Sequence, residues 1–230
     1  MSVAAAGVAL QDQETSLSLS EGLRSALMIN LGPLESETCR DYVVPRLRGA
    51  GWSLEQIVEQ YAISDGRIVV VRGKHRRGDP LRADYLLEVA PSFPVAVVEA
   101  KREYKLPSDG LQQAMRYAEL LDLPLAYSTN GKGIVERDFD SGLQTEPTGF
   151  PSPSDAWLRF RHWKGIVDDD VANGLIQPFT RQLRNPNGTV KEPRYYQRVA
   201  IERVLEAILG GRKRVLLTLA TGTGKTFVSL

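Results

Sequence analysis

Two apolar segments, residues 82–89 (RADYLLEV) and 95–101 (VAVVEAK), flank a five-residue turn with the sequence APSFP. Their aliphatic and β-branched side chains predict two strands, and the short turn between them predicts an antiparallel hairpin. The midpoint between positions 84 and 99 falls inside this turn, so the pairing would place Asp84 opposite Glu99, with their Cβ atoms about 5 Å apart. The hairpin therefore fixes which side chains share a face of the sheet.

The charged residues of this hairpin suggest a metal site. Because side chains alternate along a strand, Lys101 falls on the same face as Glu99. Two facing carboxylates repel each other unless a cation lies between them, and hard oxygen ligands suit Mg²⁺ or Mn²⁺. A nearby ammonium group could then orient an attacking water and stabilise charge on a phosphoryl group. The alternative is an ordinary surface ion pair between Glu99 and Lys101.

Further elements surround the hairpin. A helix is expected from Glu35, with Pro45 as a potential kink, and a second short helix is expected over residues 54–62. Strands are expected at residues 67–72, 124–128 and 133–138. A helix that begins at Pro107 would bury one face, formed by Leu111, Ala114, Ala118 and Leu121. Together these elements predict an α/β unit of about 120 residues.

Basic residues crowd the segment that joins the strand expected at residues 67–72 to the strand expected at residues 82–89. The whole chain carries 29 Lys and Arg against 28 Asp and Glu, so overall charge indicates no partner and only local clustering can. The cluster contains Arg72, Lys74, Arg76, Arg77 and Arg82. A basic segment that leads into a metal site would suit a phosphodiester backbone, although a solvated turn is an equal alternative.

A glycine-rich motif, ATGTGKT at residues 220–226, follows the apolar segment 214–219 (RVLLTL), which predicts a strand. In such a loop the glycines let backbone N–H groups surround phosphates, while a lysine reaches the β- and γ-phosphates and a threonine ligates Mg²⁺. The candidate nucleotide-binding residues are Thr221, Gly222, Thr223, Gly224, Lys225 and Thr226. A helix is expected over residues 195–209.

Composition shifts predict the domain organisation. Residues 1–20 are expected to form a weakly ordered tail, and residues 21–140 the α/β unit. Residues 141–155 contain three prolines, so residues 141–193 are interpreted as a linker with connecting helices. Residues 194–230 would begin an ATPase domain. Because the motif lies so near the last residue given, we expect a piece of a longer motor protein, with ATP hydrolysis only in the full-length subunit.

Several classes of protein are excluded at this stage. The chain has one cysteine, Cys39, and two histidines, which argues against an intrachain disulfide, a thiolate zinc cluster and a histidine-rich metal site. No apolar run approaches the roughly 20 residues of a membrane span. The first residues also lack the basic flank of a signal peptide. We therefore expect a cytoplasmic protein without a membrane partner.

The candidate residues of the hairpin and of the helix after it resemble the RecB-like branch of the PD-(D/E)xK nuclease superfamily. The matching positions are Glu37, Asp84, Glu99, Lys101, Gln113 and Tyr117. The resemblance implies that Asp84, Glu99 and Glu37 hold the metal, that Lys101 assists hydrolysis, and that Gln113 and Tyr117 support the site. Ala83 stands where the motif has proline. Without the resemblance, Gln113 and Tyr117 would be two polar residues at the border of a helix.

The C-terminal motifs, TGTGKT together with RYYQ at residues 194–197, resemble those of superfamily 2 helicases, which implies that Gln197 contacts adenine. The alternative for RYYQ is an ordinary helix start with aromatic packing. The implied fold is an α/β nuclease core with a central mixed sheet flanked by helices, followed by the start of a RecA-like P-loop domain. This order of parts resembles the restriction subunit of type I restriction-modification enzymes. It implies an ATP- and Mg²⁺-dependent endonuclease that acts on double-stranded DNA with modification and specificity subunits. A nuclease–helicase fusion from repair or from another phage-defence system, or a nuclease-dead motor, remains an alternative.

Overall fold

The computed structural model describes residues 39–64, 68–71, 74–77, 80–177, 187–189 and 193–228. Its central element is a mixed six-stranded sheet in the order β1-β4-β5-β6-β7-β8. The strands of this sheet are β1 (Ile57–Ser64), β4 (Leu81–Ala90), β5 (Phe93–Ala100), β6 (Leu125–Thr129), β7 (Ile134–Asp138) and β8 (Gln144–Thr145). Neighbouring strands are antiparallel except β5 and β6, which are parallel. The predicted mixed α/β fold is confirmed at this level.

The β4–β5 hairpin has the register predicted from the sequence. Tyr85 pairs with Val98 and Leu87 with Ala96, and continuing this register places Asp84 opposite Glu99. Every residue of β5 is buried, so both faces of this strand lie under other elements.

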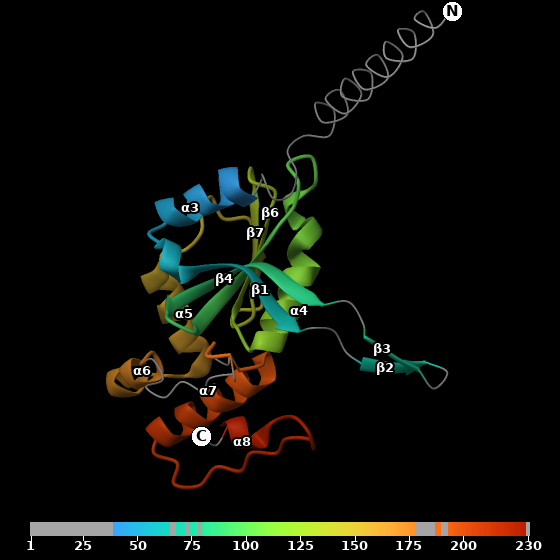
Figure 1. The fold of residues 1–230 in the computed structure, drawn as a ribbon. Helices are drawn as coiled ribbons and strands as arrows, with labels where there is room; N and C mark the ends of the chain where they lie inside the picture. Colours follow the sequence, from blue (N-terminus) through green and yellow to red (C-terminus); the bar gives the residue numbers. More distant parts are fainter. Residues whose placement is uncertain are drawn as a thin grey trace, which may run out of the picture.

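Helices pack on both sides of the sheet (Figure 1). The helix α4 (Leu111–Leu121) follows a 3₁₀ turn, η3 (Pro107–Gly110), and buries the predicted apolar face together with Tyr117. The helices α3 (Val44–Gly49) and α5 (Pro153–Lys164) lie on the other side. A π-type turn, η1 (Cys39–Val43), precedes α3, and Pro45 lies in the first turn of α3, where its missing N–H leaves no helical hydrogen bond unmade.

The prediction of a helix over residues 54–62 is wrong. A 3₁₀ turn, η2 (Leu54–Gln56), is followed directly by the strand β1. Ile57 pairs with Leu87 and Tyr61 with Ala83, so the edge of β4 supplies hydrogen bonds that a short isolated helix would lack. Long-range pairing here overrides the local helical pattern.

The segment interpreted as a linker contributes to the core. Phe150 is buried, and the ring of Phe160 on α5 packs edge-on against Phe93 of β5 with centroids 5.3 Å apart. Trp157 stacks on Phe160 at 5.6 Å. Aromatic burial thus joins this proline-containing segment to the sheet, although the predicted domain boundaries themselves stay a prediction.

The helix α7 (Tyr195–Leu209) is confirmed where the sequence predicted it. It packs on α4 and on α6 (Asp169–Leu175). Asp122, at the end of α4, accepts hydrogen bonds from Lys164 of α5 at 2.6 Å and from Arg203 of α7 at 3.0 Å. Burial acts to raise the pKa of Asp122, but these two cations lower it overall. One carboxylate therefore ties three helices together.

The prediction of a strand at residues 214–219 is wrong. These residues form no strand in the described part of the chain, and the side chain of Leu216 is 93% exposed. A strand requires a hydrogen-bonded neighbour, and none of the described segments pairs with this one.

The described helices were also compared with the length and hydropathy of a membrane span, and none of them meets both requirements.

Glu202 in the middle of α7 is a half-buried residue whose Oε1 atom is buried, with charges of both signs around it. Its Oε1 atom accepts no hydrogen bond from the described residues. Burial raises the pKa of Glu202 to about 8; Arg198 and Lys164 act to lower it, whereas Glu206 and Asp122 act to raise it further. Glu202 therefore binds its proton more tightly in the folded state than in the unfolded chain.

This preference predicts a pH dependence of stability. Between pH 4.5 and 8 the folded state keeps the Glu202 proton while the unfolded chain releases it, so the free energy of unfolding falls as pH rises, by at most about 1.4 kcal/mol per unit. Glu202→Gln should remove this part of the slope. Urea unfolding across this pH range measures it, and Glu119→Gln, at an exposed position of α4, should behave as wild type. An unchanged slope in Glu202→Gln would contradict the assignment.

Candidate active site

Asp84 and Glu99 meet across the β4–β5 hairpin, as the register predicted. The backbone N–H of Asp84 donates to Oε1 of Glu99 at 3.3 Å, and the backbone N–H of Ala100 donates to Oδ2 of Asp84 at 2.9 Å. Each carboxylate is therefore held by the backbone of the opposite strand. The rigid centre of the sheet brings the two acids together, whereas mobile loops would leave their separation variable.

The electrostatics of Glu99 are unfavourable for a negative charge. The side chain is only 1% exposed. Burial, followed by the charge of Asp84, raises the pKa of Glu99 from 4.5 to about 8, although the ammonium group of Lys101 opposes this shift. Lys101 Nζ lies 3.7 Å from Oε2 of Glu99, so the ion pair considered from the sequence is present, but its carboxylate is buried and not on the surface.

Lys101, Gln113 and Tyr117 extend the site toward α4. Lys101 Nζ donates to Oε1 of Gln113 at 3.3 Å, and Nε2 of Gln113 donates to the hydroxyl oxygen of Tyr117 at 3.2 Å. Tyr117 is buried and Gln113 is exposed. All five residues predicted as catalytic lie in one continuous series of contacts, which runs from Asp84 through Glu99 to Tyr117.

Gly110 is a residue of the site that the sequence reasoning missed. A Cβ atom at this position would lie 2.7 Å from Oγ of Ser128, 3.0 Å from Cε of Lys101 and 3.2 Å from Cβ of Glu99. The backbone N–H of Gly110 donates to the same Ser128 hydroxyl at 3.1 Å. Only glycine lets the start of α4 come this close to Glu99. The PSDG segment that ends at Gly110 reads as an ordinary turn, so no sequence signal marked the approach.

Gln60 on β1 was also missed. Its Nε2 atom donates to Oδ1 of Asp84 at 3.2 Å, so a third strand reaches the carboxylate pair. A lone glutamine inside a segment predicted as helical carries no signal for such a role.

The donor set fits a divalent cation. Two carboxylates from adjacent strands, one of them buried, provide the hard oxygen ligands and the unbalanced negative charge that Mg²⁺ or Mn²⁺ would neutralise. Within the described ranges, no group of three His, Cys, Asp or Glu residues is arranged to hold a metal ion. The third predicted ligand, Glu37, lies outside the described residues.

The predicted nucleotide loop folds as a turn followed by the short helix α8 (Lys225–Val228). Gly222 and Gly224 both have φ of +79°, a conformation that glycine adopts without strain. Lys225 and Thr226 are exposed.

Gln197 lies against this loop. Its Nε2 atom donates to the carbonyl oxygen of Thr223 at 2.8 Å, while its Oε1 atom accepts from the backbone N–H of Arg194 at 2.9 Å. Both ends of the Gln197 amide are thus bound within the chain. Its predicted contact with adenine stays a prediction.

The predicted DNA-contacting residues are only partly described. Lys74, Arg76 and Arg77 lie on β3 (Lys74–Arg77), which pairs with β2 (Ile68–Val71) in a separate two-stranded sheet. This hairpin projects away from the main sheet (Figure 1), so the expected loop is partly strand. Arg72 lies outside the described residues, and Arg82 is exposed on β4.

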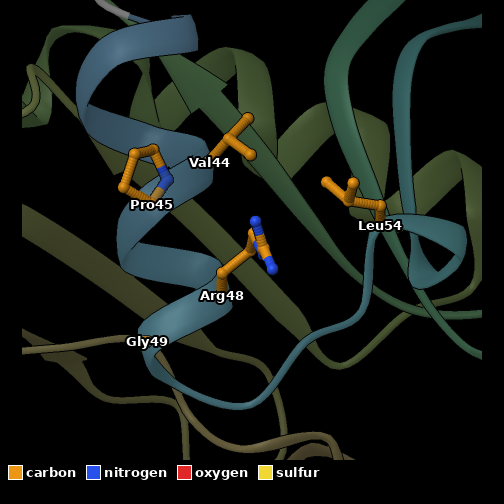
Figure 2. Close-up of a pocket in the computed structure, with 5 residues that line it drawn as sticks. All are labelled: Val44, Pro45, Arg48, Gly49 and Leu54. Carbon is orange, nitrogen blue, oxygen red and sulfur yellow. The ribbon is translucent and has the colours of Figure 1, made fainter.

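A hollow of about 460 Å³ lies at α3, away from these residues. It is lined by Val44, Pro45, Arg48 and Gly49 of α3 and by Leu54 of η2 (Figure 2). It contains none of the predicted site residues, and we assign it no role.

Comparison with known proteins places these features in context. The family described as "Type III restriction enzyme, res subunit" matches residues 190–230. The endonuclease subunit of the type I restriction enzyme EcoAI from Escherichia coli is 38% identical over 87% of this chain and 25% of its own length. The corresponding EcoKI subunit from strain K12 is 25% identical over 84% of this chain and 20% of its own length.

A solved structure is similar as well. It is a fragment described as an HsdR subunit of a type I restriction enzyme from Vibrio vulnificus YJ016, with a TM-score of 0.74 and 43% identity over 86% of this chain and 37% of that chain. This chain thus spans a quarter or less of the two curated relatives. Along most of its length it is similar to part of a type I restriction endonuclease subunit, which confirms the resemblance at that coarse level.

Because the neighbours of Gly110 lie so close, a methyl group added at this position should destabilise the fold. Gly110→Ala should lower the free energy of unfolding by about 1–3 kcal/mol, because Ser128 and Lys101 must move to admit the new Cβ. Gly149→Ala is the matched control, since nothing lies within 4 Å of a Cβ there, and its effect should be small. Denaturant unfolding of both variants measures the difference, and equal stability of the two would show that the site tolerates the displacement.

Proposed function

We propose that this chain is the DNA-cleaving part of the endonuclease subunit of a type I restriction-modification enzyme, together with the nucleotide loop of its ATP-driven motor. One observation carries the proposal: a buried glutamate and an aspartate face each other on adjacent strands beside a lysine, in a chain similar to type I endonuclease subunits. The reaction is hydrolysis of DNA phosphodiester bonds by a PD-(D/E)xK-type site that depends on Mg²⁺.

Asp84 and Glu99 would hold the cation, with Glu37 as a further ligand. When bound, Mg²⁺ would stabilise negative charge on the scissile phosphate and lower the pKa of a bound water. The desolvated position of Glu99 supports this role, because a buried carboxylate gains most from a neutralising partner.

Lys101 would act on the attacking water and on the phosphate. Its ammonium group lies beside Glu99 and is hydrogen-bonded to Gln113, so its position is fixed from two sides. Gln113 is in turn held by the buried Tyr117 hydroxyl. This arrangement presents a fixed positive charge where negative charge develops during hydrolysis.

The nucleotide loop would bind ATP in the complete subunit. Backbone N–H groups of Thr221 to Gly224 would surround the phosphates, Lys225 would contact the β- and γ-phosphates, and Thr226 would ligate Mg²⁺. ATP hydrolysis would then drive translocation along double-stranded DNA. The partners of the subunit would be the modification and specificity subunits, and the complex would work in the cytoplasm.

The projecting β2–β3 hairpin is the proposed contact with the DNA backbone. Three of the four residues of β3 are basic: Lys74, Arg76 and Arg77. In the sequence, Arg72 precedes this strand by two positions. A basic arm that projects from the nuclease sheet can reach phosphates beside the bond to be cut. Arg82 on β4 lies two residues before Asp84, so it falls on the same face of the strand.

Variants of the two acids test the nuclease proposal. Asp84→Ala or Glu99→Gln should abolish DNA cleavage in the complete restriction complex while ATP hydrolysis continues near the wild-type rate. Glu99→Gln should also fold at least as stably as wild type, because burial already disfavours the ionised carboxylate. Cleavage of plasmid DNA and ATP turnover, followed in the same reaction, are the measurements.

Two outcomes would contradict the proposal. Cleavage at the wild-type rate by either variant would show that the carboxylate pair is not catalytic. Joint loss of cleavage, ATP hydrolysis and thermal stability would show instead that the pair is needed for folding.

The basic hairpin predicts a change in salt dependence. Each lost phosphate contact should reduce the slope of log affinity against log salt concentration by about 0.9, so Arg76→Glu combined with Arg77→Glu should reduce it by nearly two. Titrations of labelled duplex DNA at several salt concentrations measure the slope. Arg48→Glu, on α3 at the other side of the sheet (Figure 1), is the control and should leave the slope unchanged. If the double substitution also leaves the slope unchanged, the hairpin does not contact DNA phosphates.

A further inference from the structure

Gln60 has a backbone conformation that its side chain makes unfavourable. It lies inside β1 with φ of +51°, in the left-handed region that residues with a Cβ rarely adopt. The strand pairing continues on both sides, where Glu59 pairs with Tyr85 and Tyr61 with Ala83. The unfavourable conformation is therefore confined to the one residue opposite Asp84.

Packing does not account for this conformation, because Gln60 and the preceding Glu59 are both exposed. Burial of the side chain thus contributes little that could offset the backbone strain. The described contact of the side chain is polar: its Nε2 atom donates to Oδ1 of Asp84 at 3.2 Å. Strained residues of this kind occur preferentially at functional sites, where the surrounding structure holds them.

The contact completes the support of the Asp84 carboxylate. Its other oxygen, Oδ2, accepts from the backbone N–H of Ala100 on β5 at 2.9 Å. The strands on both sides of β4, β1 and β5, thus each donate a hydrogen bond to one oxygen of Asp84. The two bonds together restrict rotation of the carboxylate plane. A neutral amide does this without adding charge beside Glu99, which a lysine or arginine at position 60 would do.

We propose that Gln60 is a positioning residue for the nuclease reaction, which orients Asp84 for binding of the divalent cation. The inference rests on the proposed nuclease function and extends it to a residue that no motif marks. Gln60 touches Asp84 and acts through it. Groups that orient metal ligands typically contribute 10–100-fold to metal affinity or activity.

Three substitutions separate orientation from simple structural support. Gln60→Gly removes the amide and relieves the backbone strain. Gln60→Asn keeps an amide and tolerates the left-handed conformation, but its shorter side chain does not reach Asp84. Gln60→Glu keeps the length of the side chain but has no donor. All three should raise the Mg²⁺ concentration required for half-maximal cleavage by about tenfold or more, while Gln60→Gly and Gln60→Asn keep or raise the melting temperature.

The experiment measures DNA cleavage by the complete complex against Mg²⁺ concentration, with ATP hydrolysis as the internal control for folding. Glu59→Ala, the exposed neighbour on β1, should behave as wild type, and Asp84→Ala should not cleave at any Mg²⁺ concentration. If Asp84→Ala is inactive but Gln60→Gly cleaves with the wild-type Mg²⁺ dependence, the inference about Gln60 is wrong and the nuclease proposal stands.

Two other results are decisive. If Gln60→Gly and Gln60→Asn lower the melting temperature and ATP hydrolysis together with cleavage, Gln60 is a structural residue and the inference is wrong. If Asp84→Ala itself cleaves like wild type, the proposed nuclease function is wrong, and the inference about Gln60 falls with it. A shift in Mg²⁺ dependence with retained melting temperature supports the inference.

Discussion

The buried carboxyl group of Glu99 is the constraint on which the rest of the structure depends. A charge at the centre of a sheet, under a helix, is unfavourable unless other groups compensate it. The neighbouring strand adds Asp84, which increases the repulsion, and Lys101 only partly relieves it. Gly110 lets the start of α4 cover the pair closely, so water is largely excluded from Glu99. These features are difficult to explain by stability alone, and they support the proposed cation site.

The helix α7 connects this site to the nucleotide loop. Gln197 contacts the loop at Thr223, and its neighbour Arg198 lies 3.5 Å from Glu88 of β4, with both side chains less than a tenth exposed. Arg198 also donates to the carbonyl oxygen of Ser92, in the turn between β4 and β5, at 3.4 Å. Two consecutive residues of one helix thus touch the loop and the hairpin that carries Asp84 and Glu99. The parts predicted to cut DNA and to bind ATP are physically continuous.

Features set by local symmetry or periodicity were predictable from the sequence. The position of the short turn between β4 and β5 fixed the facing positions of Asp84 and Glu99, and the spacing of apolar residues gave the buried face of α4. Features that depend on distant partners were not. β1 forms because β4 offers a hydrogen-bonding edge, whereas residues 214–219 have the composition of a strand but no paired neighbour among the described segments.

Composition was misleading where a few large side chains decide the packing. Residues 141–155 look like a linker because of their prolines, yet Phe150 is buried against the sheet and Phe160 on the following helix packs on Phe93. The close approach at Gly110 and the proposed role of Gln60 are seen only in interatomic distances of about 3 Å and in one backbone angle. Neither leaves a pattern in the sequence.

The most direct test of the central claim is an anomalous diffraction measurement on crystals of this chain soaked in Mn²⁺. The account predicts an anomalous difference peak within bonding distance of carboxylate oxygens of both Asp84 and Glu99, lost in crystals of Glu99→Gln. Absence of a peak at saturating Mn²⁺, with the Lys101 ammonium group alone neutralising the two acids, would contradict it.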